Sequence, residues 1–142
     1  MRKTADRLKK EHGTRDPFKI CRALGMILLP AELPPTTGGL FFVQDGRRIV
    51  LINRSLTEPR ARFACAHELG HAVLHEGMNG LFLQDSTYFV PGRLEREADE
   101  FAACLLIDPD LVADPQYEGF STAQLSAVFG VPEQLIPIAA KR

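Results

Sequence analysis

The N-terminal part of the chain shows two short helical patterns followed by an apolar run. Residues 4–12 are mostly polar and end at Gly13, which predicts a short and largely exposed helix. A second helix is predicted after "TRDP", because Asp16 can cap it and Pro17 suits its first turn. The run "MILL" (residues 26–29) then predicts a short buried strand.

Two runs rich in β-forming residues predict a hairpin. "GLFFVQ" and "RRIVLIN" are separated by Asp45-Gly46, a pair that tolerates positive φ. The preceding segment "PAELPPTTGG" has three prolines and two glycines, so we expect a loop there, beside an active cleft, through which neither helix nor strand passes. The run "LFLQDSTYFV" predicts a further strand near residues 81–90.

Longer helices are predicted in the second half of the chain. Ser55 and Glu58 resemble a capping box that opens a helix running from about residue 57 to 75. Residues 92–108 predict a helix of about four turns, and the segment 110–142 is expected to be helical. The pattern predicts an α+β fold, in which the helix at 57–75 packs on a short antiparallel sheet of about three strands with flanking helices.

Length and composition predict one ordinary globular domain over residues 1–142. The chain is 45% hydrophobic and 25% charged, and it has no apolar run of about the 20 residues needed to cross a bilayer. The N-terminus lacks the apolar region of a signal peptide, so we expect a cytoplasmic protein. Three cysteines without CxxC spacing are typical of buried thiols in a reducing compartment.

The charge of the chain is balanced overall but uneven along it. A formal net charge of −1 gives no general attraction to nucleic acid, so direct nucleic-acid contact is not expected. Residues 1–15, the basic N-terminal helix, carry six Lys or Arg against Asp6 and Glu11. Two interpretations remain open for this segment, a solvated helix face and a docking segment for an acidic partner.

The stretch "ACAHELGHAVLHEG" contains the residue pattern of a metal site. On a helix, residues four apart share a face, so His67 and His71 can bind one zinc ion. Glu68 lies about 100° further round, where it can act as general base without binding the ion. His75 is about 12 Å along the axis from His67. It is therefore interpreted either as a histidine that favours the negative end of the helix dipole, or as a residue that contacts a metal-binding side chain or the substrate. Gly70 is expected to permit close approach of another element.

A catalytic zinc site needs a third protein ligand and an open position. In the helix near residues 94–107, Glu95 and Asp99 share the face that continues inward, whereas Glu97 points almost the opposite way. We therefore expect Glu95 to be the third ligand and Asp99 to accept an N–H from a metal-bound histidine. Glu97 and Glu100 are expected to be solvated, and a merely solvated acidic face remains the alternative for Glu95 and Asp99.

Taken together, these segments resemble the ImmA/IrrE family of zinc metallopeptidases. "RFACAHELGHAVLH" followed by "LEREADEFAACLLI" carries the resemblance, and "HGTRDPFKICRALGMILL" and "LSAVFGVPEQLI" resemble its flanking segments. The resemblance implies a small zincin-like domain with one catalytic Zn²⁺ ion on His67, His71 and Glu95, and a catalytic Glu68. Members often lie in mobile genetic elements and cleave helix-turn-helix repressors. No DNA-binding domain precedes this one, so the repressor is expected to be a separate chain.

The sequence thus predicts a zinc endopeptidase in which Glu68 takes a proton from water and Tyr88 or His75 stabilises the oxyanion. The alternative is a module that antagonises a repressor or senses metal without cutting. The intact HELGH favours the peptidase, because a binding module has no need of Glu68. A nuclease is disfavoured, since no basic groove is indicated, and the scissile bond and oligomeric state stay open.

Overall fold

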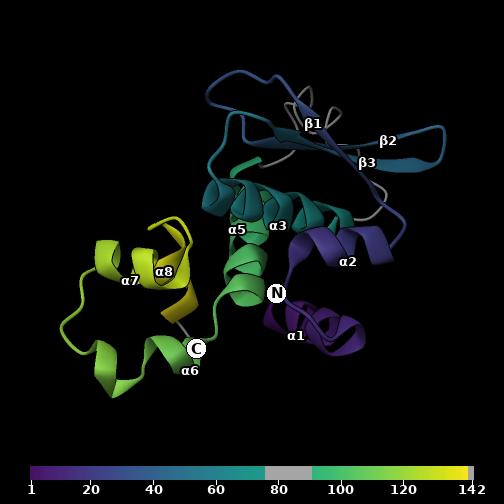
Figure 1. Cartoon of the computed structure of the whole chain (residues 1–142). Helices are drawn as coiled ribbons and strands as arrows, with labels where there is room; N and C mark the ends of the chain where they lie inside the picture. Colours follow the sequence, from purple (N-terminus) through teal and green to yellow (C-terminus); the bar gives the residue numbers. More distant parts are fainter. Residues whose placement is uncertain (76–90, 141–142) are drawn as a thin grey trace.

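The computed structural model describes residues 1–75 and 91–140, which form a small sheet with helices on one side of it. Figure 1 shows helix α3 beneath the sheet, with α5 crossing below α3, α1 and α2 on one side and α6 to α8 on the other. The predicted α+β class is confirmed. The elements are α1 (Arg2–His12), α2 (Pro17–Ala23), β1 (Ile27–Ala31), β2 (Gly39–Gln44), β3 (Arg47–Asn53), α3 (Glu58–Leu74), α5 (Pro91–Leu106), α6 (Pro109–Val112), the 3₁₀ turn η1 (Pro115–Tyr117), α7 (Thr122–Phe129) and α8 (Leu135–Ala140).

The sheet is mixed, which corrects the expectation of an antiparallel sheet. Its strand order is β1-β3-β2, and β2 pairs antiparallel with β3 as predicted. β1 instead runs parallel to β3, with Ile27 opposite Ile49. The reason is the connection, because the chain passes from β1 through β2 before β3 returns alongside β1 in the same direction. Pro30 lies within β1, against expectation. In the sheet that the described residues form, β1 is at the edge, where a residue without an N–H is tolerated.

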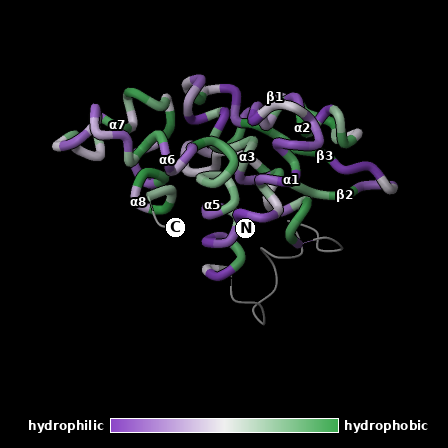
Figure 2. Tube along the Cα trace, turned by 90° about the horizontal axis from the view of Figure 1, so that it is seen from below, coloured by the Kyte–Doolittle hydropathy of each residue, from purple (hydrophilic) through white to green (hydrophobic). Residues whose placement is uncertain are grey.

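The hairpin between β2 and β3 turns at the predicted pair. Asp45 has φ 53° and Gly46 has φ 75°, so both adopt the left-handed conformation of the primed turns that suit two-residue hairpins. The turn is hydrophilic, whereas the strands that it joins are mainly hydrophobic (Figure 2). The predicted strand at 81–90 lies outside the described residues.

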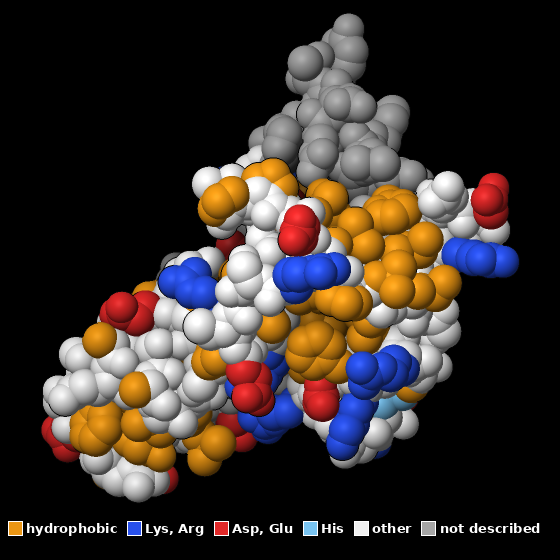
Figure 3. Space-filling model, turned by 45° about the horizontal axis from the view of Figure 1, so that its top comes forward, with side chains coloured by type: hydrophobic (Ala, Val, Ile, Leu, Met, Phe, Trp, Pro, Cys, Tyr) orange, Lys and Arg blue, Asp and Glu red, His pale blue; other side chains and the backbone are white. Residues whose placement is uncertain are grey.

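Both faces of the sheet are apolar. Phe41, Val50 and Ile52 are buried on the face toward α3, so the alternate residues of each strand point the other way. Figure 3 shows hydrophobic side chains gathered over the sheet and bordered by Lys and Arg. This explains why the strands read as nearly continuous apolar runs and not as an alternation.

Helix α3 packs closely on α5, and Gly70 makes this possible. A Cβ at Gly70 would lie 3.0 Å from Cδ1 of Phe101 and 3.3 Å from Cα of Ala98, which is too close for an undisturbed contact. The predicted role of Gly70 is therefore confirmed. The close approach matters for function, because each of these two helices carries part of the predicted metal site.

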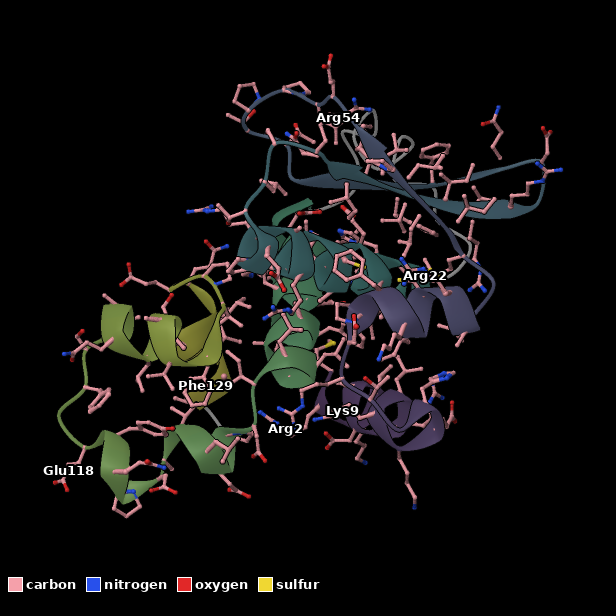
Figure 4. The ribbon with its side chains drawn as sticks, viewed as in Figure 1. Arg2, Lys9, Arg22, Arg54, Glu118 and Phe129 are labelled. Carbon is pink, nitrogen blue, oxygen red and sulfur yellow. The ribbon has the colours of Figure 1, made fainter. Side chains whose placement is uncertain are left out.

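Helix α1 is more than the largely exposed helix that the sequence predicts. Ala5 and Leu8 are buried, and Nζ of Lys9 donates a hydrogen bond to the backbone oxygen of Cys104 at 3.1 Å. Figure 4 shows Lys9 between α1 and the lower end of α5. The sequence prediction missed this packing because two apolar residues suffice to bury one face of a helix of this length.

Helix ends follow the predicted signals in part. The side chain of Asp16 accepts a hydrogen bond from the backbone N–H of Phe18 at 2.9 Å, so it caps α2 as expected. The predicted capping box of α3 is wrong, because Thr57 is the N-cap and Ser55 bonds to Asn53 instead.

The cysteines are buried free thiols, as predicted; they are Cys21, Cys65 and Cys104. Among the described helices, none is long and apolar enough to span a membrane.

Candidate metal centre

Helices α3 and α5 bring three potential metal ligands together. His67 and His71 lie one turn apart on α3, with ring centroids 4.8 Å apart, and Glu95 projects from α5. Nε2 of His67 lies 2.9 Å from Oε2 of Glu95, and Nε2 of His71 lies 2.8 Å from Oε1. The ligand atoms of the three residues all lie within 4.8 Å of one another.

The second ring nitrogen of His67 is held by Asp99. Nδ1 of His67 lies 2.8 Å from Oδ1 of Asp99, one turn after Glu95 on α5. A carboxylate can only accept a hydrogen bond at neutral pH, so the proton of this contact belongs to Nδ1 of His67. This leaves Nε2 as the atom available to a metal ion, as the sequence analysis expects.

The second ring nitrogen of His71 lies against His75. The two Nδ1 atoms are 2.9 Å apart, and Nε2 of His75 lies 3.1 Å from Oε2 of Glu97. His75 is buried, with 7% of its surface exposed. Both of its ring nitrogens have protein partners, so neither is left to donate to a substrate oxyanion.

The position of Glu97 corrects the expectation that it faces water. Leu94, Ala98 and Phe101 mark the buried face of α5. At about 100° per residue, Glu95 and Glu97 flank this face on opposite sides, so both can reach α3. Only 26% of the Glu97 side chain is exposed. The sequence prediction failed because it treated the side opposite Glu95 as solvent.

Glu68 is buried beside the ligands and has an unsatisfied oxygen. It is 7% exposed, and its Oε2 has no hydrogen-bond partner among residues 1–75 and 91–140. Burial raises the pKa of Glu68, although His67 and His71 oppose this shift. Strand β2 passes closely over it, since a Cβ at Gly39 would lie 3.2 Å from Cγ of Glu68. A water or substrate group beside Glu68 would satisfy the free oxygen.

Two of the predicted ligands, His67 and Glu95, shift each other's pKa. Burial alone would lower the pKa of His67, but its hydrogen bonds to Asp99 and Glu95 raise that pKa to about 10. The hydrogen bonds from His67 and His71 hold the pKa of Glu95 well below its ordinary value. The arrangement therefore places a carboxylate that remains ionised next to an imidazole that binds a proton tightly, and a cation can replace that proton.

A cleft of about 600 Å³ opens over these residues. One wall comes from the loop before β2, including Pro35 and Thr36, which agrees with the predicted position of the proline-rich loop. Other parts of the cleft wall are apolar side chains, among them Leu56 from the segment before α3, Phe63 from α3 and Leu94 from α5. The cleft can therefore take a chain segment with an apolar side chain next to the proposed ligands.

Asn53, a residue not predicted from the sequence to have a role, organises this loop. Asn53 is buried, and its Nδ2 lies within hydrogen-bonding distance of the backbone oxygens of Leu33, Pro34 and Thr37, at 3.2, 3.3 and 3.0 Å. Its Oδ1 accepts hydrogen bonds from the backbone N–H and the hydroxyl of Ser55. A lone polar residue at the end of an apolar strand was the available signal. Tyr88, the other predicted oxyanion donor, lies outside the described residues.

The donor set fits a catalytic metal ion. Two imidazole nitrogens and one carboxylate oxygen are ligands typical of catalytic zinc, which keeps a further position open. The buried unsatisfied oxygen of Glu68 beside them is consistent with a group bound at that position. The fold and the site thus have the features of a metal-dependent hydrolase.

Comparison with known proteins identifies the family. The family model of peptidase family M78, described as the IrrE N-terminal-like domain, matches residues 21–140. The chain therefore belongs to this peptidase family. It is 30% identical over 126 residues to metallopeptidase ImmA of Bacillus subtilis (strain 168), covering 87% of this chain and 73% of that protein. It is 28% identical over 135 residues to "uncharacterized immunity region protein 2" of Bacillus phage phi105, covering 95% of this chain and 85% of that protein.

Proposed function

We propose that the chain is a zinc endopeptidase that cleaves a helix-turn-helix repressor of a mobile genetic element. The observation that carries the proposal is the convergence, in one cleft, of His67, His71 and Glu95 with the unsatisfied buried oxygen of Glu68. The membership in a peptidase family and the similarity to a metallopeptidase support the reaction class. The name of the phage relative, an immunity region protein, supports a role beside a repressor.

The proposed mechanism assigns the proton transfers to Glu68. When bound at His67, His71 and Glu95, zinc would act as a Lewis acid that polarises the scissile carbonyl and acidifies water. Glu68 accepts the proton of the attacking water and returns it to the nitrogen of the leaving amine. Burial, which raises its pKa, makes it a better proton acceptor near neutral pH than an ordinary glutamate.

The cleft determines how a peptide would lie at the site. The apolar side chains of Leu56, Phe63 and Leu94 favour an apolar residue near the scissile bond. Gly39 leaves room for Glu68 beneath β2, so the carboxylate can face the cleft while it stays buried. Burial of this kind excludes bulk water from the proton-transfer step.

The substitution Glu68→Gln tests the proposal. The amide keeps the size of the side chain but cannot accept a proton, so we expect about one zinc ion per chain, retained repressor binding, and cleavage slower by roughly 10²- to 10⁴-fold. Glu100→Gln, an exposed change on α5, is the control and should cleave like the wild type. If derepression is undiminished in Glu68→Gln cells, cleavage is not the mechanism, and the chain acts as a non-cleaving antagonist of the repressor.

A further inference from the structure

The contacts of His71 continue beyond the proposed metal centre. His71, His75 and Glu97 form a row in which Nδ1 of His71 lies 2.9 Å from Nδ1 of His75, and Nε2 of His75 lies 3.1 Å from Oε2 of Glu97. The mechanism above uses neither His75 nor Glu97. Burying imidazoles and a partly covered carboxylate costs free energy unless they are hydrogen-bonded, and the two contacts of the row meet that need.

From this row we propose that His75 and Glu97 are positioning residues for His71. They hold the imidazole of His71 so that Nε2 points at the metal position, and they fix where its remaining proton lies. The proposal rests on the proposed ligand set, in which His71 binds through Nε2. A further carboxylate of α5, that of Glu97, then helps to orient a metal-binding histidine. It lies on the opposite flank of the helix from Glu95 and Asp99.

The proton positions follow from the partners at the two ends of the row. A carboxylate can only accept a hydrogen bond, so in the contact with Glu97 the proton belongs to Nε2 of His75, which donates it. When Nε2 of His71 binds a metal ion, it carries no proton, and the proton of a neutral His71 lies on Nδ1. Nδ1 of His71 then donates to Nδ1 of His75, which has a free lone pair. Every donor in the row thus meets an acceptor.

A third side chain fixes the carboxylate at the end of the row. Nε of Arg93 lies 3.3 Å from Oε1 of Glu97, the oxygen that does not face His75. Each oxygen of Glu97 therefore accepts from a different donor. A glutamine at this position could not do the same, because its amide has one oxygen and an NH₂ group that would face a donor.

The row mirrors the arrangement on the other ligand. Asp99 holds Nδ1 of His67 directly, at 2.8 Å, whereas Glu97 reaches His71 through His75. The connecting residue is His75, which follows His71 by one turn at the end of α3 and contacts both His71 and Glu97. Both imidazoles would then be oriented by a carboxylate of the helix that also supplies Glu95.

The test compares Glu97→Gln with Glu100→Gln, which lies on the same helix and is exposed. We expect Glu97→Gln to weaken zinc binding by about 10- to 100-fold in a chelator competition, as is typical for groups that orient metal-bound histidines. Glu100→Gln should bind zinc like the wild type. The thermal midpoints of the metal-free variants separate this effect from a general loss of stability.

A spectroscopic measurement needs no variant. In the zinc-loaded wild type labelled with ¹⁵N, we expect a scalar coupling across the hydrogen bond between the two Nδ1 atoms, with the proton on His71 and with His75 protonated at Nε2. A His75 protonated at Nδ1, or wild-type zinc affinity in Glu97→Gln, would overturn the inference while leaving the proposed function intact. A wild type that binds no zinc would overturn both.

Discussion

At the scale of the residue, a buried amide shapes the cleft beside the metal centre. Asn53 links the end of β3 to a loop that begins about twenty residues earlier in the chain, through Leu33, Pro34 and Thr37. The side-chain oxygen of Asn53, Oδ1, accepts hydrogen bonds from the backbone N–H and the hydroxyl of Ser55, which lies just before α3. One side chain therefore couples the cleft wall to the start of the histidine helix.

We expect Asn53→Asp to destabilise the chain. A carboxylate still accepts from Ser55 but faces three backbone oxygens that it cannot bond, so the free energy of unfolding should fall by roughly 2–3 kcal/mol. Urea unfolding measures this change. Ser55→Ala, which removes only one side-chain hydrogen bond to Asn53, is the matched control and should cost about 1 kcal/mol. Equal stabilities of Asn53→Asp and the wild type would show that the loop does not depend on this amide.

At the scale of the element, the site depends on how closely α3 and α5 approach. Gly70 leaves space for Phe101 and for the backbone of Ala98, and this contact lies between the turns that carry His71 and Glu95. A change in the distance between the helices would therefore move Glu95 relative to both histidines.

Gly70→Ala should destabilise the chain and weaken its metal site. Alanine favours the helix by about 1 kcal/mol, but overpacking against Phe101 and Ala98 costs about 1–3 kcal/mol and pushes α5 away. We expect a lower thermal midpoint and a higher zinc dissociation constant. Gly92→Ala is the control, because its Cβ would meet only the flexible end of Arg96. Its thermal midpoint should be equal to or higher than that of the wild type, since alanine also favours α5, and its zinc dissociation constant should be unchanged. Matching behaviour of the two variants would contradict the account of this interface.

The elements themselves were predictable where their signals are local. Asp16 and Pro17 begin α2, Asp45-Gly46 turns the hairpin, and Gly130 ends α7 with φ 67°. The parallel pairing of β1 with β3 was not, because it depends on where the chain returns after the hairpin. Helix periodicity likewise grouped Glu95 with Asp99 but could not reveal the side of α5 on which His75 lies.

At the scale of the whole molecule, folding sets the charge of the site. His67 lies on α3, and its partners Asp99 and Glu95 lie on α5, so the rise of its pKa to about 10 exists only in the folded chain. In the metal-free chain, protonated His67 therefore contributes stability below a pH of about 6.5, and this contribution is lost as the pH rises through about 10. Zinc requires the neutral imidazole and competes with this proton, so zinc affinity should increase with pH across the same window.

The most direct test of the central claim, that His67, His71 and Glu95 hold one zinc ion, is a calorimetric titration of zinc into the metal-free chain. It should be run between the ordinary histidine pKa of about 6.5 and the raised value of about 10, in buffers of different ionisation enthalpy. We predict one ion per chain, release of about one proton from His67, and a large loss of affinity in Glu95→Gln but not in Glu100→Gln. The absence of zinc binding, or binding in Glu95→Gln as tight as in the wild type, would contradict the account.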